Sequence, residues 1–248
     1  MRNLNKFIVF FTILCSSLSL SCETAAGVAT EYDEINLTTY QSDNDFLGYY
    51  FARDGAFSCR FFFMTNLSIG VARSADETSV LPMRTFDFVP HESHFSYAQR
   101  DPRAEIGGAL YLHDKEIALK TDQPHGGCLS AAGIFNAAPG ERGASQYTET
   151  RKFDAIGIAV VARRSFLHRG AEVGRLGQYL EAGDIVTLIN RRNGYSYVRF
   201  VNPDMSIEES APNKITFGWI RDSDLANPFP PSPKRELLRG GHWATHLQ

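Results

Sequence analysis

The sequence predicts a mainly β protein made of two antiparallel units, an N-terminal β sandwich or barrel and a small β-barrel after it. Short segments rich in aromatic and β-branched residues recur along the chain, and several of them alternate apolar and polar residues. Gly, Pro, Asn and Asp separate these segments, whereas helical periodicity is scarcely detectable. With 248 residues and 43% hydrophobic content, the chain has enough apolar side chains for one large core or two smaller ones.

The first 21 residues have the layout of a secretory signal. Arg2 and Lys6 precede an apolar run over residues 7–14, and mostly small residues follow up to Cys22. The apolar run is too short to cross a bilayer as a stable helix. We therefore expect residues 1–21 to be a signal peptide, which places the exported protein in the periplasm of a Gram-negative bacterium.

Removal of the signal makes the chain more acidic. The formal charge falls from −3 to −5, because residues 1–21 carry two basic residues and no acidic one. Binding to nucleic acid depends mainly on a basic surface that neutralises phosphates. We therefore expect no nucleic acid among the partners.

Cys22 has two interpretations. Residues 19–22 are similar to a lipoprotein cleavage box, in which the cysteine is lipidated and anchors the chain to a membrane, although Ser19 stands where that box usually has Leu. The alternative is an ordinary signal peptide that is cut near Ser21 or a few residues later. Residues 22–42 are small, polar and acidic without sustained periodicity, so we expect a flexible tether there.

The first folded unit is expected over residues 43–150. Six segments in it have the composition of strands and are separated by turn residues. These segments are residues 46–51, 57–64, 67–72, 85–89, 109–113 and 116–120. Asp114 and Lys115 should join the last two into a hairpin, and residues 128–137 are the best candidate for a short helix. We identify no family for this unit.

Cys59 and Cys128 are predicted to form a disulfide bond. They remain as an even pair in an oxidising compartment if Cys15 leaves with the signal and Cys22 carries lipid. The bridge closes a loop of about 70 residues, for which the loss of chain entropy in the unfolded state corresponds to about 4 kcal/mol. The alternative role of Cys128 is that of a catalytic thiolate at the start of a helix. That role needs a histidine held against the sulfur, and no suitably framed one follows.

Residues 138–151 are rich in turn formers and make the clearest break in the chain. The second unit is expected over residues 155–226. An apolar run at residues 155–162 suits a buried central strand that belongs to either unit. Further strands are predicted by the period-two pattern of residues 184–189, 195–201 and 215–220, and an Asn-Gly pair favours a tight hairpin between the first two of these.

A set of residues in the second unit follows a known order. These residues are Tyr179, Leu180, Gly183, Asp184, Val186, Leu188, Ile189, Gly194, Tyr195, Val198, Arg199, Phe200, Gly218, Trp219, Ile220, Asp224 and Leu225. Their order resembles that of the bacterial Src-homology-3 domain family and covers about a quarter of the chain. The resemblance implies a small SH3-like barrel that serves as a binding module of the cell envelope and not as a catalyst.

Side chains alternate between the two faces of the strand at residues 195–201. Tyr195, Tyr197 and Arg199 share one face. Val198 and Phe200 share the other face and are expected in the core. We expect the two tyrosines to line an exposed groove, since aromatic grooves serve peptide recognition. Trp219 suits either the groove or the core. The candidate binding residues are therefore Tyr195, Tyr197, Arg199 and Trp219.

Other chemistry has little support in the sequence. His91 and His94 stand three residues apart, but zinc needs three or four ligands and no second pair occurs at metal spacing. The chain has no nucleophile elbow, phosphate-binding loop or dinucleotide fingerprint. We expect neither a metal nor a cofactor.

These patterns predict a non-catalytic exported envelope protein, a lipoprotein, that binds peptidoglycan or a protein partner through the SH3-like module. One alternative is a periplasmic inhibitor or immunity protein against a wall-degrading enzyme, which would use a protruding loop at residues 91–103 or 205–214. A second alternative is a peptidoglycan hydrolase with an unrecognised active site in residues 43–150. The Pro-rich residues 227–248 are expected to be a mobile tail.

Overall fold

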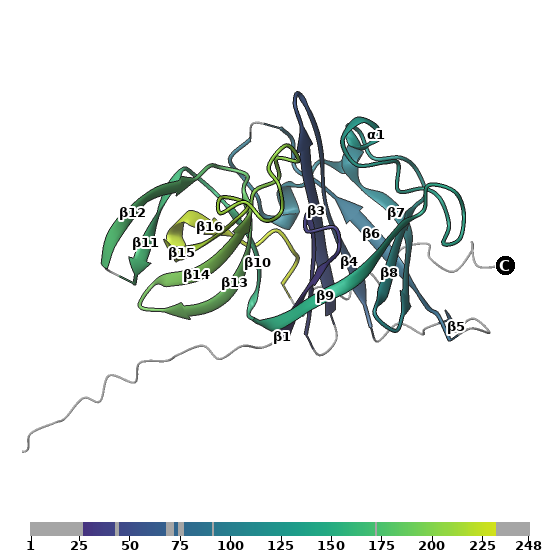
Figure 1. The fold of residues 1–248 in the computed structure, drawn as a ribbon, viewed down its shortest axis with the longest axis horizontal. Helices are drawn as coiled ribbons and strands as arrows, with labels where there is room; N and C mark the ends of the chain where they lie inside the picture. Colours follow the sequence, from purple (N-terminus) through teal and green to yellow (C-terminus); the bar gives the residue numbers. More distant parts are fainter. Residues whose placement is uncertain are drawn as a thin grey trace, which may run out of the picture.

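In the N-terminal part of the protein, up to residue 155, the strands close into an up-and-down barrel (Figure 1). This structure is a computed structural model that describes residues 27–42, 45–67, 72–73, 77–90, 92–171 and 173–231. Among these residues eight strands form the barrel, in which each strand pairs antiparallel with the next, β9 returns to β1, and the pairing of β4 with β6 completes the circle. The short strand β5 pairs with β6 beside the barrel.

The barrel strands and β5 have the following bounds: β1 Gly27–Tyr32, β2 Leu37–Gln41, β3 Asp45–Asp54, β4 Phe57–Asn66, β5 Ala72–Arg73, β6 Ser79–Phe86, β7 Ile106–His113, β8 Glu116–Thr121 and β9 Ser145–Ala155. Two 3₁₀ turns, η1 Tyr97–Gln99 and η2 Pro102–Ala104, lie between β6 and β7, and the short helix α1 Cys128–Ala131 lies between β8 and β9. The predicted hairpin of residues 109–113 and 116–120 is confirmed, since β7 and β8 pair up to His113 and Glu116.

Side chains fill the interior of the barrel. Tyr50 and Phe61 lie there with Phe135, whose ring centroid is 5.0 Å from each of theirs. Phe135 enters from the segment after α1, and its φ of 55° and the φ of 102° at Gly133 end the helix well before residue 137. An eight-stranded barrel has an interior just wide enough to be filled in this way.

The predicted disulfide bond between Cys59 and Cys128 is confirmed. It joins β4 to α1, with the two Cα atoms 4.2 Å apart, and both cysteines are buried in the barrel core. The sulfur of Cys128 is therefore bonded to Cys59 and is not a free thiol.

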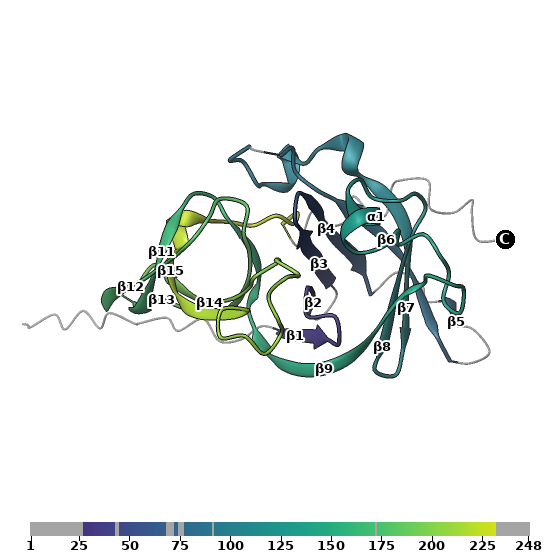
Figure 2. The same ribbon diagram turned by 45° about the horizontal axis from the view of Figure 1, so that its top comes forward.

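The described residues after β9 form a seven-stranded antiparallel sheet that curls back on itself (Figure 2). Its strands lie in the order β12-β11-β15-β14-β13-β10-β16. Their bounds are β10 Gly157–Val161, β11 Ser165–Gly170, β12 Val173–Leu180, β13 Ile185–Arg192, β14 Tyr195–Val201, β15 Ile215–Arg221 and β16 Leu225–Ala226, with the 3₁₀ turn η3 Asp222–Asp224 before β16. The mainly β class predicted from the sequence is confirmed.

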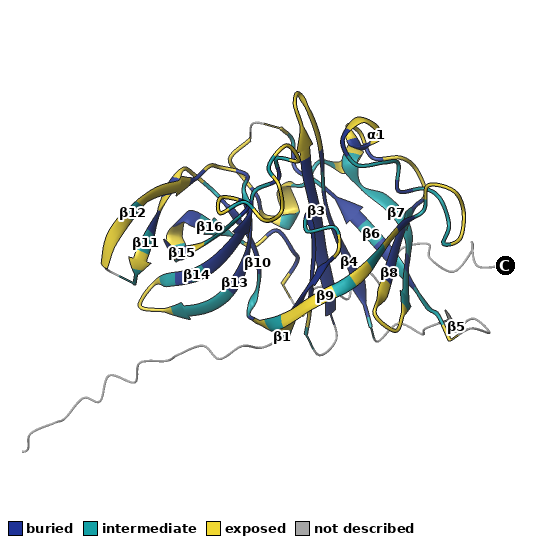
Figure 3. Ribbon diagram, in the orientation of Figure 1, coloured by how far each residue is buried: buried dark blue, intermediate teal, exposed yellow. Residues whose placement is uncertain are grey.

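The outer surface of the barrel packs against the second sheet, and the strands at this junction are buried on both faces (Figure 3). In β4, Phe61 and Phe63 face the barrel interior while Phe62 and Met64 belong to the junction. In β10, Ile158 and Val160 also belong to the junction, whereas Ala159 and Val161 lie in the core of the second sheet. Burial on both faces explains the unbroken apolar runs in the sequence.

The flexible tether predicted for residues 22–42 is wrong over its described part. Residues 27–42 contain β1 and β2, which pair with β9 and β3 to complete the barrel. The strands are polar, yet Thr30, Glu31, Thr38 and Thr39 are all buried. Their polarity hid them because a strand is normally identified by its apolar residues. Cys22 and the predicted signal lie outside the described residues.

The mobile tail predicted for residues 227–248 is wrong over its first residues. Phe229 is 3% exposed, and its ring meets those of Phe62 and Phe86 at the junction, with centroids 5.9 and 5.8 Å away. Residues 232–248 lie outside the described part of the chain. Within the described residues, no helix is long and apolar enough to cross a membrane.

Candidate functional site

Three of the four predicted binding residues meet on the outer face of the second sheet. Tyr197 of β14 lies directly opposite Trp219 of β15, and their ring centroids are 5.3 Å apart. Phe217 extends the row at 6.2 Å from Tyr197, and the ring of Tyr195 lies 5.5 Å from that of His168 on β11. The rings form one surface because side chains on the same face of neighbouring strands stand side by side. We call these five residues the aromatic face.

The aromatic face is accessible to different degrees along its length. Phe217 is 39% exposed, the two tyrosines are half-buried, and Trp219 is only 8% exposed. The guanidinium group of Arg192 lies over the indole of Trp219, 4.6 Å from its centre, and covers part of it. As predicted from alternation, Val198 and Phe200 of β14 point into the core of the second sheet.

Arg199 does not belong to this exposed surface, which corrects its prediction as a binding residue. It lies on the same side of β14 as Tyr197, but further along the strand, where the barrel covers the sheet. Its side chain is 1% exposed, and its Nε lies 2.9 Å from a carboxylate oxygen of Glu31 on β1. Burial lowers the pKa of Arg199, and the negative charge of Glu31 opposes this effect. Arg199 thus forms an ion pair at the junction.

A second feature lies beside the aromatic face, at the edge formed by β11 and β12. It is a pocket of about 340 Å³ lined by Arg163, Arg164, Ser165, Phe166, His168, Arg175, Arg221, Ser223 and Asp224. We call it the arginine pocket. Its residues come from β11, β12, the end of β15 and η3, together with the segment that precedes β11. Sequence reasoning missed it because only the folded sheet brings these distant basic residues together.

Two of the arginines in the pocket are neutralised by carboxylates. Arg163 donates from Nε to Asp224 at 2.7 Å, and Arg164 forms a two-pronged pair with Glu181 at 2.6 to 3.1 Å. Burial raises the pKa of Asp224, but hydrogen bonds from Ser165 and Arg163 outweigh it, so that this pKa lies below its usual value. The Asp224 carboxylate therefore stays charged at neutral pH.

The other two arginines have no carboxylate within ion-pair distance among the described residues. Arg175 stacks its guanidinium on the ring of Phe166, 4.6 Å from the centre, and Arg221 makes a long hydrogen bond of 3.4 Å to the hydroxyl of Tyr195. The pKa of His168 is lowered, first by burial and then by the positive charges of these two arginines. The pocket thus has an excess of positive charge.

A larger pocket, of about 610 Å³, lies at the α1 end of the barrel. Arg60 forms an ion pair there with Asp87, in which its Nε donates to both carboxylate oxygens, at 2.9 and 3.1 Å. His125 contacts Thr85 at 2.8 Å through Nε2 and stacks on Phe61, and burial lowers its pKa to about 4. The imidazole is therefore neutral at physiological pH. The nearby Cys128 is held in the disulfide, so the pocket has no thiol nucleophile among its described lining.

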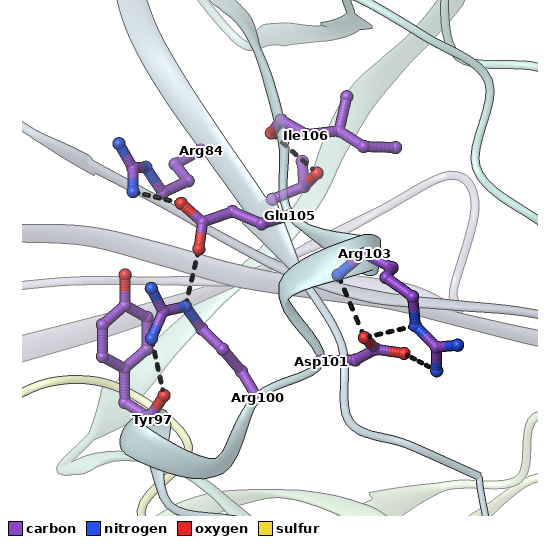
Figure 4. A network of polar contacts seen from close by, with 8 residues as sticks. Arg84, Tyr97, Arg100, Asp101, Arg103, Glu105 and Ile106 are labelled. Atoms are coloured by element: carbon purple, nitrogen blue, oxygen red, sulfur yellow. Dashed lines mark hydrogen bonds and ion pairs between the residues drawn. The ribbon is translucent and has the colours of Figure 1, made fainter. Parts of the chain in front are cut away.

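The first candidate loop, between β6 and β7, is held by ionic contacts of its own (Figure 4). Glu105 binds Arg84 and Arg100, the latter at 2.7 Å. Asp101 accepts hydrogen bonds from the backbone and side chain of Arg103 at the start of η2. Of this loop, His91 lies outside the described residues, His94 is exposed, and the described chain contains no group of three or more side chains arranged for a metal.

The second candidate loop, residues 205–214, is fixed to the barrel. The backbone N–H of Met205 donates to the carbonyl of Arg53 at 2.9 Å, and Arg53 donates to the carbonyl of Pro203 at 2.7 Å. At the other end of the loop, the buried Lys214 donates from Nζ to the carbonyl of Asp204. The loop therefore rests on the tip of the β3–β4 hairpin.

None of the protein-family models, curated proteins or solved structures compared with the chain matches it. A function must therefore be inferred from the residues and geometry described above.

Proposed function

We propose that the protein is a non-catalytic binding protein of the cell envelope, whose residues 155–226 form an SH3-like barrel that holds peptidoglycan or a protein partner. The signal pattern of residues 1–21 supports export to the periplasm of a Gram-negative bacterium, and lipid on Cys22 anchors the protein to a membrane in this proposal. The disulfide between Cys59 and Cys128 fits an oxidising compartment.

The order of the second sheet supports the SH3-like assignment. Its first strand, β10, pairs with its last, β16, so that the two ends of the unit meet. Between them, β11 and β12 form a hairpin, β13, β14 and β15 form a meander, and the 3₁₀ turn η3 leads into β16. The sheet is small, antiparallel and curled around one apolar core, as a small barrel is.

The single observation that carries the binding proposal is the aromatic face. Four aromatic rings and an imidazole stand together on one side of the sheet, and Phe217, Tyr195 and Tyr197 keep part of their surface in water. Aromatic residues that are exposed as a group are typical of protein and peptide binding sites, where a few of them supply most of the binding free energy.

A cosedimentation experiment with purified sacculi tests this function. We expect the mature protein to bind, and the substitutions Tyr197→Ala and Phe217→Ala to weaken binding by about tenfold each, which corresponds to about 1.4 kcal/mol. Phe57→Ala is the matched control, because Phe57 is also an exposed aromatic residue but lies on the barrel. Parallel capture of envelope proteins distinguishes the wall from a protein partner.

The proposal fails if the protein retains neither sacculi nor an envelope protein. It also fails if the two variants of the aromatic face, with unchanged thermal stability, bind as well as Phe57→Ala does. Binding that is lost only from sacculi, or only from a protein partner, identifies which of the two ligands the face holds.

A second candidate is an inhibitor or immunity protein, and the contacts in the β6–β7 loop favour it. Inhibitors commonly present a loop that is already in its bound conformation, because a rigid loop loses little entropy on binding. Arg103 is 82% exposed at its side chain while Asp101 holds it in place. An assay of wall-lytic enzymes with and without the protein tests this role. We expect Arg103→Ala to abolish inhibition in this case, and an absence of inhibition by the unaltered protein excludes it.

A further inference from the structure

The arginine pocket concentrates positive charge at one point of an otherwise acidic protein. The register of the sheet causes this, because His168 of β11 lies opposite both Arg175 of β12 and Trp219 of β15. Arg221 stands two residues after Trp219 and therefore on the same face of β15. The two arginines thus approach the imidazole of His168 from the two strands that flank β11.

Within the described chain, ion pairs involve only two of the four arginines of the pocket. Arg163 and Arg164 have carboxylate partners, but Arg175 and Arg221 have none within ion-pair distance among the described residues. Like charges held close together repel each other, and a bound anion removes that repulsion. The stacking of Arg175 on Phe166 also holds its guanidinium in place without using its hydrogen-bond donors.

The polar groups of the pocket are suited to one class of ligand. Guanidinium groups present paired N–H donors that match the oxygens of a carboxylate or a phosphate. The hydroxyl group of Ser223 also lines the pocket. A volume of about 340 Å³ accommodates a small group at the lower end of the usual range for ligand pockets.

We propose that the arginine pocket binds an oxyanion group, a carboxylate or a phosphate, between Arg175 and Arg221. The pocket adjoins the aromatic face, because Arg221 bonds to Tyr195 and His168 belongs to both surfaces. This inference rests on the proposed function for the identity of the whole ligand: the anionic group occupies the pocket while the rest of the same ligand lies on the rings. The ligand is therefore an acidic one.

The test is a titration of the mature protein with two probes, inorganic phosphate and succinate, followed by NMR. We expect saturable shifts at Arg175, His168 and Arg221, and a rise in the pKa of His168 when the anion is bound, since a nearby negative charge favours the imidazolium. Arg175→Gln and Arg221→Gln should each weaken binding by about tenfold or more. Both side chains are exposed, and thermal melting checks that the variants remain folded.

Arg142→Gln is the matched control, because Arg142 is exposed on the loop before β9 and the substitution changes the net charge equally. The control should bind both probes as the unaltered protein does. Saturation by succinate alone identifies a carboxylate as the natural group, saturation by phosphate alone identifies a phosphate, and either supports the site. Shifts that chloride reproduces at equal ionic strength, or variants that bind like the control, overturn it.

The sacculus experiment is independent of this one. If the protein binds sacculi through its aromatic face but takes up neither probe, the oxyanion site is refuted and the proposed function stands. If the probes bind at the pocket and neither sacculi nor envelope proteins do, the site stands and the proposed function is refuted.

Discussion

The ion pair between Arg199 and Glu31 indicates that Arg199 holds the barrel and the second sheet together and does not bind a ligand. Its side chains are 1% and 8% exposed, so both charges have left water. Removal of one member of a buried pair leaves the other charge uncompensated and costs about 3–5 kcal/mol, whereas replacement of both by apolar residues is often close to neutral. We therefore expect Arg199→Met to lower the free energy of unfolding by about 3–5 kcal/mol, and the double replacement with Glu31→Met to restore most of it.

Urea unfolding followed by circular dichroism measures these changes. Arg163→Met is the control, because Arg163 is 64% exposed in its pair with Asp224, and such pairs contribute less than about 1 kcal/mol. Binding of Arg199→Met to sacculi, measured where the variant is still folded, should be unchanged. The structural role is refuted if Arg199→Met is as stable as the control. A folded Arg199→Met that no longer binds sacculi would show that Arg199 takes part in binding.

Three further predictions concern other parts of the fold. Joint replacement of Cys59 and Cys128 by Ala should lower the free energy of unfolding by about 4 kcal/mol, since the bridge spans a sequence separation of 69, and unchanged urea midpoints would contradict this. Phe229→Ala should cost about 3–5 kcal/mol in the same assay because the ring is buried at the junction, and a loss below 1 kcal/mol, roughly that of a surface site, would show that the ring packs there only loosely. Burial raises the pKa of Asp184 to about 6, so the folded state binds a proton more tightly than the unfolded state and stability falls as the pH rises from about 4 to about 6. Asp184→Asn should make the pH dependence of stability over this range smaller by about 3 kcal/mol, and parallel pH profiles of the two proteins would show that Asp184 does not cause it.

The sequence predicts those parts of the fold that depend on local residue patterns or on the number of cysteines. The β7–β8 hairpin and the alternation in β14 follow from local patterns, and the disulfide follows from the count of cysteines in an exported chain. β1 and β2 were missed because their buried residues are polar. Glu31 becomes acceptable in a buried strand only when Arg199, 168 positions later, comes to lie against it, and no local pattern contains that information.

The candidate site shows the same division. Tyr195 and Tyr197 are correctly placed on the outer face by alternation, because their exposure depends only on which side of β14 they occupy. Alternation places Arg199 on that same side but cannot say where the barrel begins to cover it. The arginine pocket depends on pairings across strands, such as His168 with Arg175, and these are set by the register of the sheet.

The packing of the barrel against the second sheet also determines where a ligand has access. In Figure 1, β10 and β13 lie beside the barrel and β11 and β12 lie at the far end of the second sheet, and Figure 2 again shows β11 and β12 farthest from the barrel. The outer face of the sheet is thus divided: its near part is closed by the Arg199–Glu31 pair and the ring of Phe229, and its far part carries the aromatic face and the arginine pocket. Substitutions at the junction should therefore reduce stability more than they reduce ligand binding. A ligand at the far end should have little effect on the Arg199–Glu31 pair. To test whether the two regions are independent, an anion that binds the arginine pocket is added to Arg199→Met and to the unaltered protein. The anion should stabilise both proteins by the same amount.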